Sequence, residues 1–112
     1  MRVNYLLTDE ATEDLDSIWN YIAADNPDAA NRVEEAIFDA CEILGEFPSL
    51  GAVRPEITRK PVRFWTVSRY RNFVIIYRSD ITPIHVLKVV HGRQDLKTVV
   101  LANSYPVIST FL

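Results

Sequence analysis

The residues of this chain with the clearest potential for acid–base chemistry lie close together late in the sequence. His85 and His91 are the only histidines, and Arg93 and Asp95 follow His91 within the segment 91–95. The histidines lie six residues apart on one predicted strand, on the same face but roughly 20 Å apart, too far to share a metal ion. His91 beside Asp95 could form an acid–base pair, whereas no Ser/His/Asp set has a supporting order or spacing.

Arginines interleaved with aromatic residues form a second group that could bind a partner. Guanidinium groups bind carboxylates or phosphates through paired hydrogen bonds, and aromatic rings on a sheet can stack nucleic-acid bases. The pattern suits either a nucleic acid or an acidic protein, and the sequence leaves that choice open. The group comprises Arg63, Trp65, Arg69, Tyr70, Arg71, Phe73, Arg78 and Arg93.

Several other kinds of chemistry have no support in the sequence. Cys41 is the only cysteine, which excludes an intrachain disulfide and a cysteine zinc cluster, and its place on an apolar helical stripe indicates a core residue. The three glycines are too far apart to form a phosphate-binding loop. We therefore expect no metal and no cofactor. Because no signal peptide or membrane-spanning stretch is recognisable, we expect a cytoplasmic protein without a membrane partner.

The net charge of −3 conceals an uneven distribution of charge along the chain. Residues 1–50 hold two basic and twelve acidic residues, a balance of −10, and residues 51–112 hold ten basic and three acidic residues, a balance of +7. Such asymmetry indicates either an acidic or nucleic-acid partner on one face, or attraction between the two halves within the fold.

Two helices in direct succession must carry the acidic half of the chain. Thr8 is a favourable N-cap for the first helix, and Asn26 followed by Pro27 is a favourable start for the second. Almost no loop separates the helices, so they are predicted to form an antiparallel helical hairpin. The apolar residues of the first helix fall at i, i+3, i+4 and i+7 and form one stripe: Leu15, Ile18, Trp19 and Ile22.

Short apolar runs predict four strands, at residues 3–7, 62–67, 73–77 and 84–90. The last two are apolar at nearly every position and are joined by a polar link, which indicates an antiparallel pair in the middle of a sheet. The predicted fold is α+β, a helical hairpin packed on an antiparallel sheet in the order β-α-α-β-β-β. One domain covers residues 1–102, with a weakly indicated helix at 96–102, and residues 103–112 form a C-terminal tail.

A series of short motifs runs along the chain in a fixed order over residues 1 to about 100. They are Ala11-x-x-Asp14-Leu15-x-x-Ile18-x-x-Tyr21-Ile22, Ala29-Ala30, Leu44-x-x-Phe47-Pro48-x-x-Gly51, Tyr70-Arg71-x-Phe73-x-Ile75-x-Tyr77-Arg78 and Val90-His91-Gly92-Arg93-x-Asp95. This ordered set resembles the ParE branch of the ParE/RelE superfamily, the toxins of bacterial type II toxin–antitoxin pairs. The resemblance implies inhibition of DNA gyrase by binding, and neutralisation by a cognate ParD-like antitoxin in a hetero-oligomer.

The resemblance also helps to decide between the two branches of the superfamily. RelE-type members cut mRNA on the ribosome and need basic residues on the middle strands, where this chain has Trp65, Val67 and Val74. Gln94 and Val100 stand where such nucleases carry an Arg and a Tyr or His. Because general acid–base catalysis needs several convergent groups, we favour the non-enzymatic branch, with no catalytic residues.

Two alternatives to a gyrase inhibitor stay open from the sequence. The first is a RelE-like ribosome-dependent mRNA endoribonuclease, in which His91 and Arg93 would be the catalytic pair. The second is a non-toxic member of the superfamily that acts only in a regulatory complex with its antitoxin. The acidic sequence pI of about 5.3 is a mild departure for a toxin and is consistent with this second alternative.

Two surfaces are expected to bind partners. The target-binding surface is expected to comprise His91, Arg93, Asp95 and Trp65. The antitoxin is expected to pack an amphipathic helix against the helical hairpin and the sheet edge, and to pair its acidic side chains with arginines. The antitoxin-binding residues are expected to be Leu15, Ile18, Trp19, Ile22, Arg63, Arg69 and Arg78.

Overall fold

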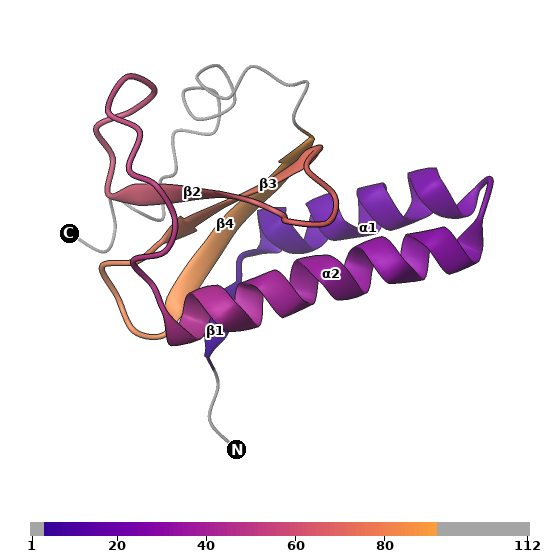
Figure 1. Ribbon diagram of the computed structural model, residues 1–112, viewed down its shortest axis with the longest axis horizontal. Helices are drawn as coiled ribbons and strands as arrows, with labels where there is room; N and C mark the ends of the chain where they lie inside the picture. The colour runs from indigo at the N-terminus through magenta and orange to yellow at the C-terminus, as the bar shows by residue number, and fades with distance from the viewer. Residues whose placement is uncertain (1–3, 92–112) are drawn as a thin grey trace.

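The computed structural model describes residues 4–91, so the predicted helix at 96–102 and the tail at 103–112 lie outside the described residues. The observed order of elements is the predicted β-α-α-β-β-β (Figure 1), and the α+β fold is confirmed. The elements are β1 (Tyr5–Leu7), α1 (Asp9–Ala23), α2 (Pro27–Glu46), β2 (Val62–Thr66), β3 (Phe73–Arg78) and β4 (Ile84–His91).

The two helices begin where the sequence predicts them to begin. The side chain of Thr8 accepts a hydrogen bond from the backbone N–H of Ala11 at 3.1 Å, and Asn26 Oδ1 accepts one from Ala29 N–H at 3.1 Å. Each cap satisfies a backbone donor that has no partner within its helix. The helices run antiparallel and side by side on one face of the sheet, and the end that joins them reaches beyond the strands (Figure 1).

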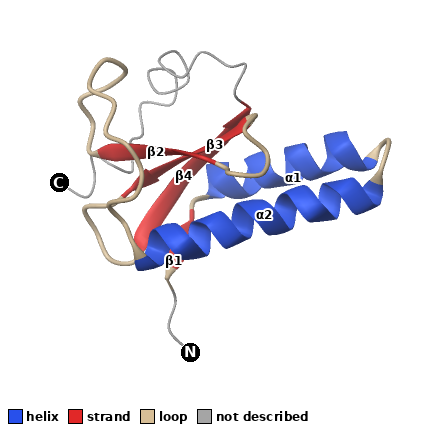
Figure 2. Cartoon of the chain, in the orientation of Figure 1, coloured by secondary structure: helices blue, strands red, loops and turns tan. Residues whose placement is uncertain are grey.

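The four strands form one sheet in the order β1-β4-β3-β2 (Figure 2). The pairs β2–β3 and β3–β4 are antiparallel as predicted, but β1 runs parallel to β4, with Tyr5 opposite Ile84, so that the sheet is mixed. The short apolar run of β1 carries no signal for strand direction, because direction depends on the path that α1 and α2 impose before the chain returns to the sheet.

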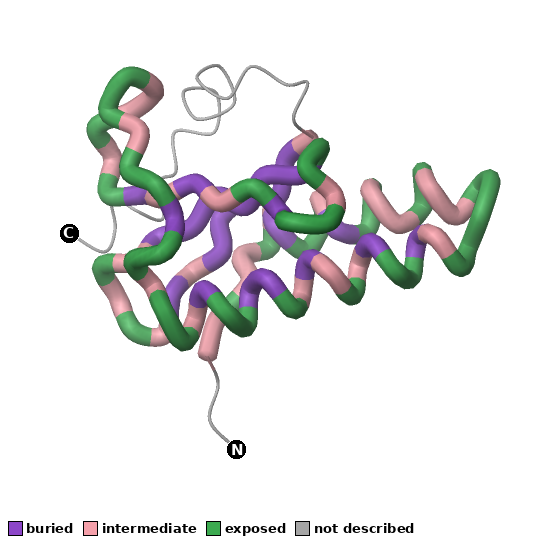
Figure 3. The backbone as a smooth tube through the Cα atoms, in the orientation of Figure 1, coloured by how far each residue is buried: buried purple, intermediate pink, exposed green. Residues whose placement is uncertain are grey.

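Apolar side chains fill both faces of the central strands. The larger cluster lies between the sheet and the helical hairpin and includes Leu15, Ile37, Leu44 and Tyr77. A smaller cluster on the opposite face includes Val62, Phe64, Val74, Ile76, Leu87 and Val90. All six residues of β3 are buried, as the run of buried backbone through the sheet in Figure 3 illustrates. This double burial explains why β3 and β4 lack a polar face in the sequence.

A register shift interrupts the pairing of β3 with β4. Ile76 pairs with Lys88 but Tyr77 pairs with Val86, so Leu87 is an extra residue in β4, a β-bulge. The bulge changes the side-chain alternation and puts His85 and His91 on opposite faces of the sheet, not on the same face as predicted. His91 lies on the helix-facing side with its partner Phe73.

Candidate functional site

The end of β4 carries His91, the last residue that the structure describes. The His91 ring contacts the ring of Phe73 edge-on, with 5.5 Å between the centroids and 84° between the planes. This contact holds the half-buried imidazole against the edge of the larger core cluster. Arg93 and Asp95, which were predicted to share the site, lie outside the described residues.

The start of α1 is fastened to β4 on both sides of the bulge. Thr8 Oγ1 donates to the carbonyl of Leu87 at 3.0 Å, and Thr8 N–H donates to Val86 O at 3.1 Å. Past the bulge, the Asp14 carboxylate accepts hydrogen bonds from Lys88 Nζ and from the backbone N–H of Val89, both at 2.9 Å. Sequence reasoning did not assign this role to Asp14, although Asp14 belongs to the first family motif.

Trp65 lines an open cleft next to the turn between β2 and β3. The cleft has a volume of about 330 Å³, and its other lining residues are Thr66, Ser68 and Arg71. The indole of Trp65 is partly buried and packs against the larger core cluster. The cleft therefore combines an aromatic surface, two hydroxyl groups and a guanidinium, a set that can bind an anionic group beside an apolar one.

The strand register brings the cleft and His91 to the same end of the sheet. Thr66 pairs with Val74, and Val74 pairs with Val90, so the three residues form one row across β2, β3 and β4. His91 follows Val90 directly and shares the helix-facing side with Trp65. Of the four predicted target-binding residues, the two that the structure describes lie on the same side of the sheet, on β2 and β4, with β3 between them.

Two of the three predicted antitoxin-binding arginines already make internal contacts. Arg63 donates to Ser79 Oγ at 3.1 Å and to the carbonyl of Gly51 at 2.8 Å. Arg78 is 2% exposed and forms a two-pronged ion pair with Asp80, at 2.6 and 2.9 Å. The hydrogen bonds from Arg78 hold the pKa of the Asp80 carboxyl below its usual range.

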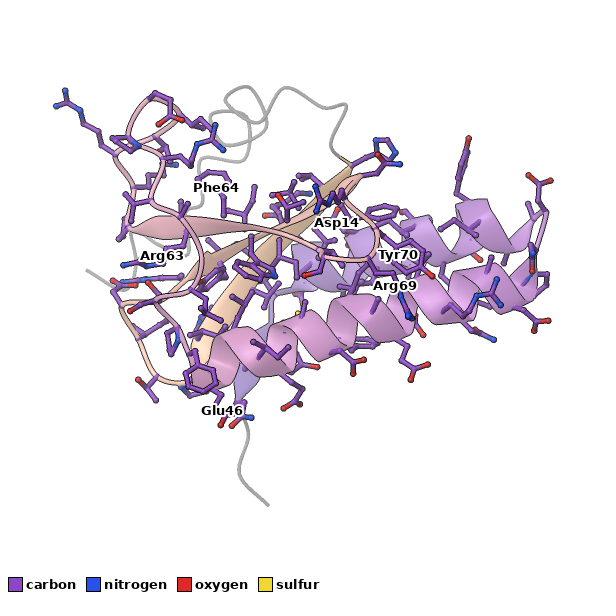
Figure 4. The ribbon with its side chains drawn as sticks, in the orientation of Figure 1. Asp14, Glu46, Arg63, Phe64, Arg69 and Tyr70 are labelled. Atoms are coloured by element: carbon purple, nitrogen blue, oxygen red, sulfur yellow. The ribbon has the colours of Figure 1, made fainter. Side chains whose placement is uncertain are left out.

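Arg69 differs from these two arginines because its side chain is exposed on the turn between β2 and β3, beside Tyr70 (Figure 4). Within residues 4–91 it makes no ion pair. Among the three predicted arginines it is therefore the one whose guanidinium is presented to solvent.

The predicted apolar stripe of α1 faces inward for most of its length. Leu15 is 5% exposed and belongs to the larger core cluster, while Ile18 and Ile22 pack against that cluster and are partly buried. Trp19 is also partly buried, and its indole N–H donates to Asn31 Oδ1 on α2 at 2.9 Å. Leu15 therefore stabilises the hairpin from within, and the other three residues retain some accessible surface.

Tyr77 holds the loop that follows α2 against the sheet, a role that sequence reasoning did not assign. Its buried hydroxyl donates to Pro48 O at 2.6 Å and accepts from Gly51 N–H at 2.9 Å. Burial raises the Tyr77 pKa, whereas the bond from Gly51 and the charge of Arg63 oppose the shift. A Cβ on Gly51 would lie 2.6 Å from the Tyr77 hydroxyl oxygen, so this position excludes larger residues. The buried tyrosine thus accounts for the glycine of the motif Phe47-Pro48-x-x-Gly51.

The described residues offer no metal site and no reactive thiol. No group of three or more His, Cys, Asp or Glu side chains within residues 4–91 could hold a metal ion. Cys41 is fully buried, and burial raises its pKa to about 12, so the thiolate that would react is disfavoured. No helix in the described range is long and apolar enough to cross a membrane.

The positions where a nuclease would carry basic residues are apolar in this structure. Val67 and Val74 are 2% and 8% exposed and lie within the two core clusters, and Trp65 is packed at the edge of the larger one. These three positions on the sheet therefore supply none of the basic side chains that a RelE-type nuclease needs.

Comparison with known proteins identifies the family. The sequence matches the family model described as "ParE toxin of type II toxin-antitoxin system, parDE" over residues 5–96, so the chain belongs to the ParE toxin family. A solved structure entitled "Chromosomal ParDE TA system from P. aeruginosa" is similar, with a TM-score of 0.65 and 26% sequence identity. That similarity covers 78% of this chain and 92% of the other. No curated protein matches the sequence significantly.

Proposed function

We propose that this member of the ParE toxin family inhibits DNA gyrase by binding to it in the cytoplasm. A cognate ParD-like antitoxin neutralises the toxin in a hetero-oligomer. The observation that supports both parts is the family match over residues 5–96, which spans every helix and strand of the fold. The similarity to a solved ParDE system agrees with an antitoxin partner.

Inhibition by binding, not by catalysis, agrees with the chemistry of the described residues. General acid–base cleavage of RNA needs a proton acceptor, a proton donor and charge stabilisation at one place. Here the nuclease positions on the strands hold buried valines and a packed tryptophan. The proposed target surface comprises Trp65, His91, Arg93 and Asp95, of which the structure describes Trp65 and His91.

Arg93 is the residue in this proposed surface that is best suited to test it. Arg93→Ala should relieve inhibition of gyrase supercoiling, because a guanidinium supplies paired hydrogen bonds that alanine cannot replace. Arg32→Ala is the matched control, since Arg32 is exposed on α2 and belongs to neither proposed surface. Thermal melting should show both variants folded. An Arg93→Ala variant that melts like the parent and still inhibits fully would remove Arg93 from the target surface.

The proposed antitoxin surface combines the exposed Arg69 with the accessible parts of Ile18, Trp19 and Ile22 on α1. Leu15, Arg63 and Arg78 contribute indirectly, by holding the hairpin and the sheet edge in position. An acidic side chain of the antitoxin that pairs with Arg69 would form a charge-assisted hydrogen bond, worth about 1.5–3 kcal/mol. Arg69→Ala should therefore weaken the complex by about tenfold or more.

Titration calorimetry of the antitoxin against Arg69→Ala tests this surface. Arg59→Ala is the control, because Arg59 is also an exposed arginine and lies in the loop that precedes β2. An unchanged dissociation constant for Arg69→Ala, or an equal loss for Arg59→Ala, would exclude Arg69 from the antitoxin surface.

A ribosome assay separates the proposed function from the nuclease alternative. Purified toxin incubated with programmed ribosomes should give no mRNA cleavage above background. Codon-specific cleavage that disappears in His91→Ala would instead assign the protein to the RelE-type nucleases. A toxin that neither cleaves mRNA nor inhibits gyrase, but binds its antitoxin, would be the non-toxic regulatory member.

A further inference from the structure

The last turn of α2 and the loop that follows it expose three large apolar side chains. Ile43, Phe47 and Leu50 are 48%, 55% and 47% exposed, and we call these three residues the α2-end patch. Scattered single apolar residues are ordinary on a protein surface, whereas a group close together indicates an interaction site.

Backbone hydrogen bonds hold the three residues of the α2-end patch close together. Phe47 N–H donates to Ile43 O at 2.8 Å, which places the two residues one helical turn apart. Leu50 N–H donates to Phe47 O at 3.1 Å, so the next turn of the loop brings Leu50 back beside Phe47. Local backbone hydrogen bonds thus bring the three residues of the patch together.

Polar contacts on its buried side hold the loop that carries Leu50 in place. Tyr77 bonds to Pro48 O and Gly51 N, Arg63 donates to Gly51 O, and Ala52 pairs with Phe64 on β2 through two backbone hydrogen bonds of 2.8 and 2.9 Å. A surface that is already ordered loses little conformational entropy when a partner binds. The buried side of the loop therefore holds the exposed apolar side in one arrangement.

Among the described residues, the last turns of α2 beside the α2-end patch carry acidic side chains and no basic one, and Arg63 contacts the loop through Ser49 O and Gly51 O. Glu42 and Glu46 lie in the last turns of α2, where the helix dipole favours cations, and the last turn contains no basic residue. Asn4 Nδ2 donates to Glu42 Oε2 at 2.9 Å, but within residues 4–91 Glu46 has no ion pair. Figure 4 shows Glu46 on the outer side of the end of α2. A cation placed here would interact favourably with Glu46 and with the helix end.

We propose that the α2-end patch binds an amphipathic segment of a partner protein that combines apolar side chains with Lys or Arg. The apolar side chains cover Ile43, Phe47 and Leu50, and a basic side chain pairs with Glu46 and the carbonyl end of α2. This surface contains none of the residues proposed for the target or the antitoxin. The proposal does not depend on whether the protein inhibits gyrase.

Two synthetic peptides test the proposed chemistry. The first is a short amphipathic helical peptide with leucine on one face and arginine on the other, and the second has glutamate in place of arginine. Fluorescence anisotropy with the full chain should show that the arginine peptide binds about tenfold more tightly or better. Equal binding of both peptides would overturn the proposed charge preference.

Two variants locate the binding of the arginine peptide. Phe47→Ser should weaken it by about tenfold or more, whereas Tyr21→Ser, which alters a side chain that is 84% exposed on α1, should leave it unchanged. Glu46→Lys should also weaken binding of the arginine peptide by about tenfold or more. Glu35→Lys should not weaken it, although both residues are exposed on α2 and both variants change the net charge equally. Equal effects of the two charge reversals would mean unspecific attraction and would overturn the proposal.

Further measurements test whether these variants fold and whether the α2-end patch binds a second copy of this chain instead of a basic partner. Thermal melting must show Phe47→Ser folded, and if it is not, Leu50→Ser takes its place with the same expected loss of binding. Sedimentation of the parent protein should show no association that depends on concentration and disappears in Phe47→Ser. Such association would assign the α2-end patch to a homodimer and overturn the proposal of a basic partner.

Discussion

Tyr77→Phe removes one oxygen atom from the interior and tests how the loop after α2 is held. The hydroxyl of Tyr77 makes two hydrogen bonds, to Pro48 O at 2.6 Å and from Gly51 N–H at 2.9 Å. The Tyr77 side chain is fully buried, and the aromatic ring is retained in phenylalanine, so the apolar packing changes little. The effect on stability is therefore expected to come almost entirely from the lost hydrogen bonds.

The size of the effect follows from the burial of the two partners. Each net hydrogen bond contributes about 0.5–1.5 kcal/mol, and a buried donor left without an acceptor costs about 1–3 kcal/mol. Gly51 is buried, so its N–H loses its acceptor, whereas Pro48 is only half-buried and its carbonyl can bond to water. Tyr77→Phe should therefore lower the free energy of unfolding by about 2–3 kcal/mol, a large part of the roughly 5–15 kcal/mol typical of a domain.

Urea denaturation measures this loss directly as a lower midpoint with an unchanged m-value. Tyr21→Phe is the matched control, because Tyr21 is 84% exposed and should lose less than about 0.5 kcal/mol. If Tyr77→Phe were no more destabilising than Tyr21→Phe, the hydroxyl of Tyr77 would not hold the loop, and the ordered presentation of the α2-end patch would lose its physical basis.

Two further predictions concern Asp14, which fastens α1 to β4, and His85, which lies within β4. Asp14→Ala removes the acceptor of Lys88 Nζ and Val89 N–H and should lower the free energy of unfolding, measured in urea, by about 1–3 kcal/mol. Asp16→Ala, at an exposed position of the same helix, should lower it little. Equal losses would contradict the role of Asp14. Burial, and to a lesser extent the charge of Arg78, lower the pKa of His85, so the folded state disfavours the protonated imidazole. The protein should therefore lose stability as the pH falls below the unfolded-state pKa of about 6.5. In His85→Gln, denaturation curves between neutral and mildly acidic pH should show a flatter dependence, and an unchanged slope would count against this cause.

The local features of the fold could be predicted because they depend on neighbouring residues. Thr8 and Asn26 cap the helices through backbone donors three residues ahead, so their roles can be read from a few letters of sequence. The apolar run at residues 73–77 similarly indicated a strand in the middle of a sheet, and β3 lies between β2 and β4 and is buried throughout.

The direction of β1 and the bulge in β4 could not be predicted because they depend on distant partners. β1 is three residues long, and its parallel pairing with β4 involves residues almost eighty positions later in the chain. The bulge at Leu87 leaves no trace in an apolar run, because both faces of the strand are buried and an extra residue alters no polar pattern. The faces of His85 and His91 were mispredicted for the same reason.

The candidate site was predictable in its residue types but not in its internal contacts. The positive charge and planar shape of arginine indicated a partner-binding surface, yet Arg63 and Arg78 make hydrogen bonds to Gly51 and Asp80. Such contacts depend on where the loops lie in three dimensions. Leu15 was correctly assigned to an apolar stripe, but the pattern could not tell a stripe that faces the core from one that faces a partner.

The most direct test of the central claim is how toxin inhibition depends on gyrase concentration in a supercoiling assay. A toxin that acts by binding tightly should require more toxin for half-inhibition as gyrase is raised, in proportion to the number of gyrase molecules. Prior addition of an equimolar cognate antitoxin should abolish inhibition. Complete loss of supercoiling at toxin levels far below those of gyrase would contradict binding and indicate catalysis, and full supercoiling at any toxin level would exclude gyrase as the target.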